Sequence, residues 1–407
     1  MALVSYVIGA CPSCGTPKSY GNVMVSGNAL CRGCLHCKQW DRIPLPVLQK
    51  KIFYLDQFFF SHAFRGEHKM FVEARERIAE LAFAQQIVAP YSNLHEDESQ
   101  LWTENQRAPL LKFIKQTSCG HKFRYEYDVK SRQIHRAFKS FLARSSPVQS
   151  TERSDALNSD VNHWDGYVWI DVGNFSEKHD ELKRRKSASG EQLLDAFDAW
   201  ANTPSTFADD VRIELRSSAE AYISTYIDYV QQIVGGDASA FLTANENSMM
   251  IEGLLNYHDK LPATLRMQRI QAFFASEYFA NVPCERIGSE LFALLRQRLR
   301  EGAYRNREKN RKRFGGLFYD VRFIATYAPY CDAMVLDNLM YTWATDSQID
   351  LPQRYGVKLF SRHNWGDFLL YLSDIASSQR PEVDEALKLI RPPNARTPAW
   401  IRRGASQ

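Results

Sequence analysis

Five cysteines in a short amino-terminal stretch constrain the fold of this chain more than any other feature. They form two CxxC motifs, Cys11–Cys14 and Cys31–Cys34, across a 16-residue spacer, and Cys34 and Cys37 form an overlapping third. Four thiolates at such spacing suit one tetrahedral zinc ion at about 2.3 Å per sulfur. We predict a structural zinc bound by Cys11, Cys14, Cys31 and Cys34, because so short a segment cannot fold on apolar burial alone. Cys37 could replace one of these ligands, and the spacing does not decide which cysteine is spare.

The composition is that of an ordinary globular protein. Of 407 residues, 44% are hydrophobic and 24% charged, enough to bury a full core in about two or three domains. A net charge of +4 is too small to indicate a polyanionic partner by itself. No stretch reaches the roughly 18 apolar residues of a membrane span, and no secretory leader is evident. We therefore expect a cytoplasmic protein without a membrane partner, in which the isolated Cys119, Cys284 and Cys331 are ordinary buried thiols.

The cysteine segment is similar to zinc ribbons, which often bind nucleic acid or protein. We expect such a ribbon over residues 1–45. The first fifty residues contain a single acid, Asp41, and several basic residues, namely Lys18, Arg32, Lys38, Arg42 and Lys50. This local excess of positive charge favours an accessory contact with RNA.

After the ribbon, strand and helix patterns alternate. Residues 51–56 and 86–92 are expected to be buried strands, joined by a helix over 68–85 with apolar residues at helical spacing. The same alternation resumes near residue 315 and gives strands over 331–337 and 356–361. We infer an α/β fold in which residues 46–100 and 311–395 form one domain around a parallel sheet.

The intervening residues 101–310 are predicted to form a mainly helical insertion. Residues 122–129 alternate as a strand does, but longer helical patterns follow. The clearest helix covers 209–234 and stops at Gly235 and Gly236. The insertion is expected to bind a protein partner or a second copy of the chain.

Carboxylates fall at matching ends of the expected strands and helices. Asp56 ends the first strand, and Glu98 lies on the helix that Ser92 caps. Asp320 opens a later helix, and Asp337 ends the strand after it. The carboxyl ends of parallel strands share one edge with the starts of the helices that follow. We therefore expect these four acids to converge.

Neighbouring residues are assigned by the same geometry. His95 lies three residues before Glu98, on the same face of its helix. Glu96 replaces Glu98 if the helix boundary shifts by one or two residues. Asp332 begins the strand that Asp337 ends, which puts it roughly 16 Å away at the opposite edge, where a structural role is expected.

Converging carboxylates repel one another unless protons or cations occupy the site. Oxygen ligands alone favour magnesium or manganese over zinc. Two such ions about 4 Å apart activate a water molecule and stabilise the leaving oxygen in phosphodiester cleavage. The acidic edge therefore predicts a metal-dependent phosphodiesterase.

The order of these motifs resembles the PIN-like nuclease superfamily. The resemblance rests on "YLDQ", "PYSNLHEDE", "YDVRFIATYAPYCDAMVLD" and the final strand "KLFS", within residues 50–100 and 313–390. It implies a PIN-like parallel sheet with flanking helices. It also implies that Asp56, Glu98, Asp320 and Asp337 are catalytic residues that bind the metal, and that His95 orients Glu98 or touches substrate. PIN-like domains are metal-dependent ribonucleases that frequently act as toxins or in antiphage defence. The long insertion and the zinc ribbon depart from the compact family pattern.

A basic segment precedes Asp320. Residues 295–314 hold nine Arg or Lys against two Glu, with Tyr304 and Phe314 at the margins. One-signed charge beside an acidic edge suits phosphate backbones, and the aromatic residues suit single-stranded nucleic acid. The sequence does not distinguish RNA from DNA.

Two alternatives remain open. The stretch 166–186 contains a strand pattern ending in Asp171, with Asn174 behind it, similar to the start of another PIN-related group, and a catalytic domain could begin there. The other alternative is a non-catalytic RNA-binding or scaffold subunit that relies on the zinc ribbon and the basic segment. Our first hypothesis is a magnesium- or manganese-dependent endoribonuclease.

Overall fold

Two separate β-sheets organise the molecule. The computed structural model describes residues 4–391 except 159, 165–190, 192, 242–243, 259–260 and 315. The first sheet is antiparallel, with strand order β1-β2-β3-β4, and the second has the order β6-β5-β7-β8 with every pairing parallel. The fold is therefore mixed α/β, with the parallel sheet and the amino-terminal sheet both present.

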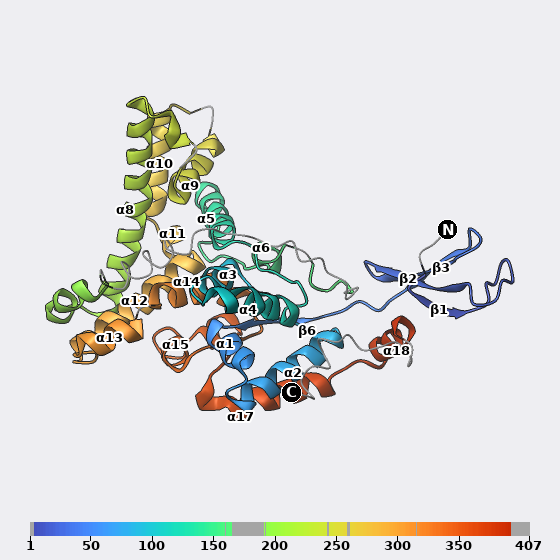
Figure 1. The fold of residues 1–407 in the computed structure, drawn as a ribbon. Coiled ribbons are helices and arrows are strands. Elements are labelled where there is room, and N and C mark those ends of the chain that lie inside the picture. Colours follow the sequence, from blue (N-terminus) through green and yellow to red (C-terminus); the bar gives the residue numbers. More distant parts are fainter. Residues whose placement is uncertain are drawn as a thin grey trace.

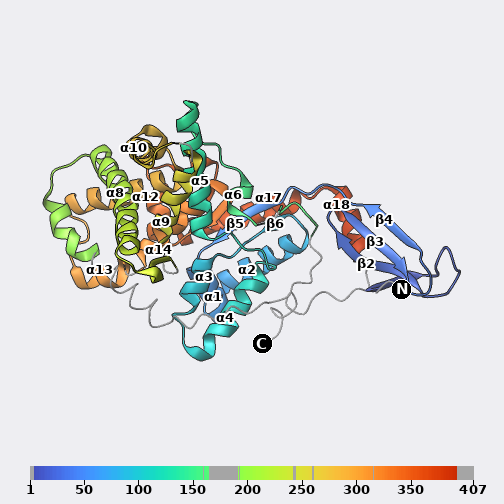
Figure 2. The same cartoon turned by 90° about the horizontal axis from the view of Figure 1, so that it is seen from above.

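The antiparallel sheet is formed by the cysteine segment. Its strands are β1 (Tyr6–Gly9), β2 (Tyr20–Ser26), β3 (Ala29–Cys34) and β4 (Trp40–Pro44). One face buries Leu30 in a small apolar cluster with Trp164 and with Val383 of helix α18 (Pro381–Ile390). The sheet lies at one end of the molecule beside α18 (Figure 1 and Figure 2). Its apolar cluster is thus completed by a helix from the far end of the chain.

The parallel sheet joins segments that are distant in the sequence. Its strands are β5 (Lys51–Leu55), β6 (Ile87–Val88), β7 (Ala333–Val335) and β8 (Lys358–Phe360). β5 and β7 are direct neighbours, with Leu55 opposite Val335. Because both strands run the same way, their carboxyl ends lie at one edge of the sheet.

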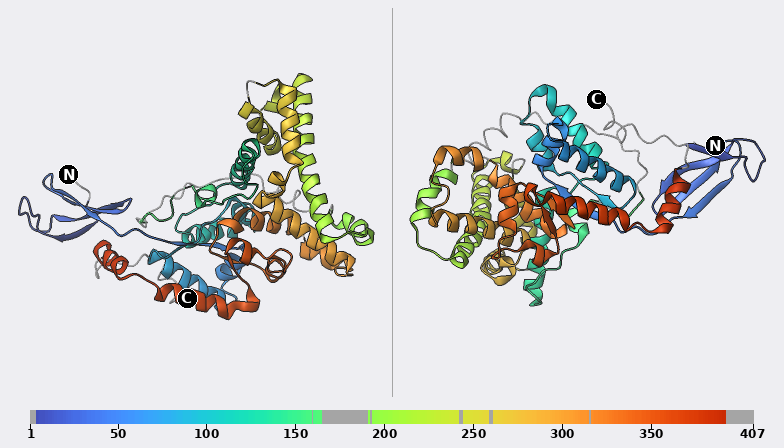
Figure 3. Two further views of the ribbon diagram at one scale, coloured as in Figure 1. Left: turned by 180° about the vertical axis from the view of Figure 1, so that it is seen from behind. Right: turned by 90° about the horizontal axis from the view of Figure 1, so that it is seen from below.

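Helices cover both faces of this sheet, as the alternation along β5 requires. Phe53 and Leu55 point into one apolar cluster, packed by α1 (Gln57–Arg65), α2 (Lys69–Phe83) and α17 (Trp365–Ser377). Figure 3 shows α2 in blue and α17 in red along the same side of the sheet. Ile52 and Tyr54 point into the other cluster, which includes Phe323 and Tyr327 of α14 (Leu317–Tyr327). Every side chain of the strand from Ile52 to Leu55 is therefore buried.

Residues between the two halves of the sheet are mostly helical. The long helices α8 and α10 rise away from the body of the molecule (Figure 1). Helices of this region include α4 (Glu104–Thr117), α5 (Glu126–Ala143), α6 (Arg153–Ala156), α8 (Phe207–Val234), α9 (Glu246–Leu255), α10 (Ala263–Phe274), α11 (Glu277–Ala280), α12 (Pro283–Arg300) and α13 (Arg307–Phe314), with 3-10 turns η1 (Ala238–Phe241) and η2 (Asn256–His258).

The remaining short elements border the sheet. They are α3 (Asn93–Ser99), α15 (Asn338–Ala344), α16 (Leu351–Tyr355) and the 3-10 turns η3 (Ala328–Tyr330) and η4 (Arg362–Asn364). None of the helices in the described part of the chain has the length and apolarity that crossing a bilayer requires.

Three local sequence predictions were wrong or incomplete. The strand expected over residues 122–129 is instead a short bridge at Phe123 followed by α5, because Ile134, Ala137 and Phe138 recur at helical spacing and are buried together in one apolar cluster. Helix α1 was not anticipated, since "QFFF" continues the apolar run of β5 without a visible break. Asp320 lies in the first turn of α14 but does not open it, because the helix begins at Leu317.

Candidate functional site

Four cysteines meet in the antiparallel sheet. The sulfur atoms of Cys11, Cys14, Cys34 and Cys37 all lie within 4.8 Å of one another. The Cys11 and Cys37 Sγ atoms are 3.6 Å apart, and those of Cys14 and Cys34 are 3.8 Å apart. A tetrahedron with zinc–sulfur bonds of 2.3 Å has edges of about 3.8 Å. The two shortest separations therefore match a zinc tetrahedron, and the four sulfurs together could bind a zinc ion.

The predicted ligand set was wrong in one member, because Cys37 occupies the position assigned to Cys31. Cys31 lies inside β3, paired with Met24 and Arg42. Side chains three residues apart on a strand point to opposite faces, so Cys31 and Cys34 cannot both reach the cluster. Cys37 returns to Cys34 through the hairpin between β3 and β4. Its spacing from Cys34 equals that of Cys31, so spacing alone could not separate the two.

Backbone amides donate hydrogen bonds to three of the four sulfurs. The amides of Ser13, His36 and Gln39 approach the sulfurs of Cys11, Cys34 and Cys37 at 3.4, 3.3 and 3.5 Å. These N–H groups favour the thiolate form that a metal requires. Of the three isolated cysteines, Cys284 and Cys331 are buried and Cys119 is partly buried.

At the parallel sheet, Asp56 and Asp337 meet at the carboxyl edge. Asp56 follows β5 and caps α1, accepting a hydrogen bond from the Gln57 amide at 2.6 Å. Asp337 follows β7 and caps α15, accepting from the Met340 amide at 2.8 Å. The Asp56 amide donates to the Val335 carbonyl at 3.1 Å. The two carboxylates are thus held at adjacent strand ends by their own helix starts.

The pKa of Asp56 is raised well above its usual range in the folded protein. Burial is the largest cause, followed by the negative charges of Asp337 and Glu98. The amides of Gln57 and Asp337 oppose the shift. A cation bound to these carboxylates would remove the same penalty, since it favours the charged form.

Glu98 and Asp320 complete the acidic edge from two other helices, α3 and α14. The pKa of the Tyr54 hydroxyl shows that these acids are near it, because that pKa is raised well above its usual range. Burial is the largest cause, and the negative charges of Asp56, Glu98 and Asp320 add to it. Asp56, Glu98 and Asp320 therefore lie near one buried phenol, and Asp337 acts on Asp56 itself. They are not tightly clustered, because no three of them bring oxygens within 4.8 Å of one another in the described structure.

His95 is a structural residue of this edge. It is fully buried, with Nδ1 accepting from the Ser92 amide at 2.9 Å and Nε2 donating to the Leu55 carbonyl at 2.8 Å. Burial lowers the pKa of His95 to about 4, so the ring is neutral. It neither contacts solvent nor points to a substrate position, and it fastens α3 to the end of β5.

The acids beside Glu98 face elsewhere. Glu96 forms an ion pair with Lys122 at 2.7 Å. Burial, and then the neighbouring Glu96, raise the pKa of Asp97 to about 6. Glu98 is thus the acid of α3 whose charge acts on Asp56. Asp332 lies at the opposite edge, as expected, where it accepts from the Ile52 amide at 2.8 Å and pairs with Arg153 and Lys51.

Several amide and hydroxyl groups near this edge escaped the sequence analysis. Gln57 is 7% exposed, and neither atom of its amide has a hydrogen-bond partner among the described residues. The same holds for the buried Oδ1 atoms of Asn93 and Asn338 and the hydroxyl of Tyr54. Gln57, Asn93 and Asn338 each follow a helix cap at this edge. Buried polar groups without partners are costly, so this edge is suited to a polar ligand.

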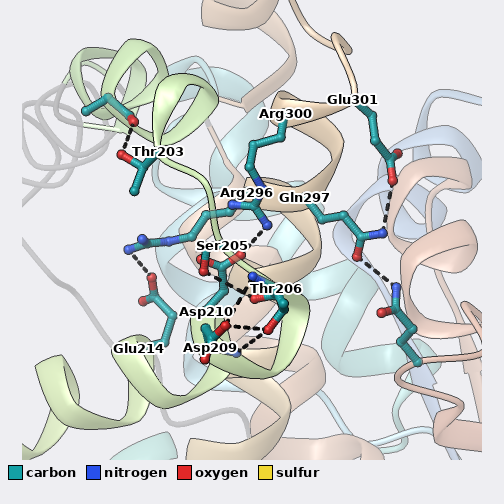
Figure 4. A network of polar contacts seen from close by, with 12 residues as sticks. Thr203, Ser205, Thr206, Asp209, Asp210, Glu214, Arg296, Gln297, Arg300 and Glu301 are labelled. Carbon is teal, nitrogen blue, oxygen red and sulfur yellow. Dashed lines mark hydrogen bonds and ion pairs between the residues drawn. The ribbon is translucent and has the colours of Figure 1, made fainter.

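Four of the nine basic residues of the predicted basic segment form internal ion pairs. Arg296 pairs with Glu214 at 2.5 Å, and Arg300 pairs with the buried Asp210 (Figure 4). Arg298 pairs with Asp346 at 2.8 Å, and Arg311 pairs with Glu191. These arginines fasten α12 and α13 to their neighbours and are not displayed for a phosphate backbone. Asp171 and Asn174 lie outside the described residues.

Comparison of the chain with models of known protein families, with curated proteins and with solved structures finds no match. The site must therefore be interpreted from its own geometry.

Proposed function

We propose that the protein is a magnesium- or manganese-dependent ribonuclease, PIN-like in the arrangement of its acids, with its active site at the carboxyl edge of the parallel sheet. The observation that carries the proposal is the meeting of Asp56 and Asp337. They come from strands β5 and β7, which are adjacent in the sheet but far apart in the sequence. A buried acid beside a second, partly buried acid at the neighbouring strand end is costly unless a cation or a proton offsets the charge.

In this proposal, Asp56 and Asp337 are the first ligands of the cation, and Glu98 and Asp320 complete its surroundings. The bound ions would supply an activated water and stabilise the leaving oxygen. The unpaired amides of Gln57 and Asn338 would orient water or phosphate oxygens. Asp56 binds either a proton or a metal, so activity is expected to fall at low pH.

RNA is proposed as the substrate because of the resemblance of the motifs and the outer face of the ribbon. Trp40 is 49% exposed, and Arg42, two residues further along β4, is exposed on the same face. An aromatic ring beside a guanidinium suits a stacked base and its phosphate. The arginines of α12 are not part of this surface. A role as a toxin or in antiphage defence remains a proposal from the resemblance alone.

The decisive experiment compares cleavage of labelled single-stranded RNA and DNA of one sequence with Mg²⁺, with Mn²⁺ and without either ion. Wild type should cleave RNA only with metal, and Asp56→Asn and Asp337→Asn should each reduce the rate by roughly 100-fold or more. Asp374→Asn, an exposed acid of α17, is the matched control and should retain full activity. Inactive wild type, or equal activity of Asp56→Asn and wild type, would contradict the proposal.

One observation favours the second candidate, a non-catalytic RNA-binding subunit. The four acids do not form a compact ligand set, since no three bring oxygens within 4.8 Å in the described structure. Under this alternative, wild type binds RNA without cleaving it, and Trp40→Ala weakens binding whereas Asp56→Asn does not.

A further inference from the structure

A second group of potential metal ligands lies at the turn between α1 and α2, apart from both sites described above. His62, Glu67 and His68 each offer one ligand atom, and these three atoms lie within 4.8 Å of one another. The His62 and His68 rings have centroids 5.0 Å apart and are inclined at 61°. Within the described structure, this is the only group besides the cysteines that meets this distance.

The local sequence "HAFRGEH" creates this proximity. His62 lies in the last turn of α1, and Gly66 ends the helix in the left-handed region at φ 68°. The Gly66 amide donates to the His62 carbonyl at 3.1 Å, which folds the chain back over the helix end. His68 then occupies the cap position of α2. The left-handed cap, for which glycine is the favoured residue, therefore brings the two imidazoles together.

The His62 ring is fixed in place by packing, but one of its nitrogen atoms has no hydrogen-bond partner among the described residues. His62 stacks on Phe71 with centroids 4.9 Å apart and an interplanar angle of 16°. Its Nδ1 atom is buried and has no hydrogen-bond partner among the described residues. Glu67 and His68 are exposed, which leaves room for water in the remaining coordination positions. Two imidazoles and one carboxylate with open positions suit a divalent transition-metal ion better than magnesium.

Positive charge is the main opposing factor. The guanidinium of Arg362 lies over the ring of Phe71, on which His62 stacks, at 5.4 Å from its centroid. The positive charges of Arg362 and Arg65 both disfavour further positive charge at His62. Glu67 offsets part of this charge. Arg65 is engaged with the Trp102 ring at 4.6 Å. Arg362 is therefore the side chain that should limit the affinity for a cation.

We infer that His62, Glu67 and His68 bind a divalent transition-metal ion such as Zn²⁺, at a site independent of the cysteine cluster and of the acidic edge. The ion joins the last turn of α1 to the residue that caps α2. Since Asp56 caps the start of α1, the site also stabilises the helix that positions the acidic edge. The inference does not depend on the nuclease proposal.

The test measures zinc per chain by elemental analysis after equilibrium dialysis of the full-length protein against micromolar Zn²⁺. Wild type should bind one equivalent more than His62→Ala and His68→Ala, and Glu67→Gln should weaken that equivalent roughly tenfold. His163→Ala, an exposed histidine elsewhere, is the control and should bind as wild type does. Cys14→Ser should lose the other equivalent and keep this one.

Two further results decide the matter. Arg362→Gln should tighten binding of the added equivalent, because it removes a neighbouring positive charge. His68→Gln keeps the helix cap region polar and serves if the alanine variant folds poorly. Equal zinc content in wild type, His62→Ala and His68→Gln would overturn the inference, as would weaker binding in Arg362→Gln.

Discussion

At the residue scale, the two candidate metal sites differ in how completely they are formed. Four cysteine sulfurs lie within 4.8 Å of one another, and two of their separations, 3.6 and 3.8 Å, match the edge of a zinc tetrahedron. The carboxylates of the acidic edge are less tightly grouped, since no three of them bring oxygens within 4.8 Å of one another in the described structure. Burial, and then the charges of Asp337 and Glu98, raise the pKa of Asp56. The cysteine cluster could bind a zinc ion with its sulfur atoms close to their present positions, whereas the carboxylates of the acidic edge would have to move closer together to share one cation.

Cys31 and Cys37 provide a direct test of the zinc ligands. Cys37→Ser should lose zinc and destabilise the antiparallel sheet, because a serine hydroxyl is a poor zinc ligand. Cys31→Ser should keep zinc and cost only about 1 kcal/mol, because it buries a hydroxyl between Met24 and Arg42. Zinc content per chain and the urea midpoint of each variant check both outcomes. Zinc loss in Cys31→Ser alone would restore the original ligand set.

Asp56 should oppose folding when no cation is present. Its pKa is raised in the folded protein, so its contribution is most favourable below the usual aspartate range and is lost as pH rises through the folded pKa. Asp56→Asn keeps a helix cap and removes the charge, so it should stabilise the metal-free protein at pH 7 by about 1 kcal/mol or more. Mn²⁺ should raise the melting temperature of wild type but not of Asp56→Asn, as calorimetry would reveal.

At the element scale, short polar links between strands and helices determine the shape of the acidic edge. His95 joins the start of α3 to the end of β5 through Ser92 and Leu55. The turn after α1 depends in a similar way on Gly66. In both cases, one buried or backbone hydrogen bond fixes where a helix starts or stops, and the charged side chains follow.

His95 should give the protein a pH-dependent stability of known sign. Its folded pKa of about 4 lies below the unfolded value of 6.5, so stability is lost as pH falls from about 6.5 towards 4. The full loss is roughly 3 kcal/mol. Urea unfolding at pH 7 and pH 5 should show this slope in wild type and not in His95→Gln. Asp56 contributes an opposite slope, so the comparison should be repeated in the Asp56→Asn background.

At the scale of the whole molecule, the antiparallel sheet has its own apolar cluster, separate from the clusters on either face of the parallel sheet. Trp164, Val383 and Ala386 connect it to distant parts of the chain. The zinc-dependent sheet is therefore expected to behave as a distinct unit that α18 attaches to the body.

Removal of zinc should unfold this unit alone. A strong chelator should expose amides of β1–β4 and α18 to hydrogen exchange, whereas β5 and β7 should remain protected, because their neighbours do not include the cysteines. Exchange measured by mass spectrometry with and without chelator checks this. Loss of protection across the parallel sheet as well would indicate a single cooperative unit.

Local signals were sufficient for much of this architecture. The apolar run from Ile52 to Leu55 predicted a strand buried on both faces, and the helical spacing in 209–234 predicted α8. An acid that directly follows a parallel strand was predicted to lie at the carboxyl edge of the sheet, because the direction of the strand alone decides at which edge it lies. The local pattern of residues 122–129 suits both a strand and a helix, and tertiary packing favoured helix α5, which begins within this stretch.

The sequence by itself predicted the parallel sheet, a cysteine cluster that could bind a metal and the edge of the parallel sheet that carries Asp56 and Asp337. Only the tertiary structure decided which four cysteines meet, that Arg296 and Arg300 of α12 pair with Glu214 and Asp210, and that amides beside the acids lack partners among the described residues. The physical reason is range. Periodicity and strand direction are properties of neighbours along the chain, whereas ion pairing, strand faces and unmet hydrogen bonds depend on which distant side chains pack together.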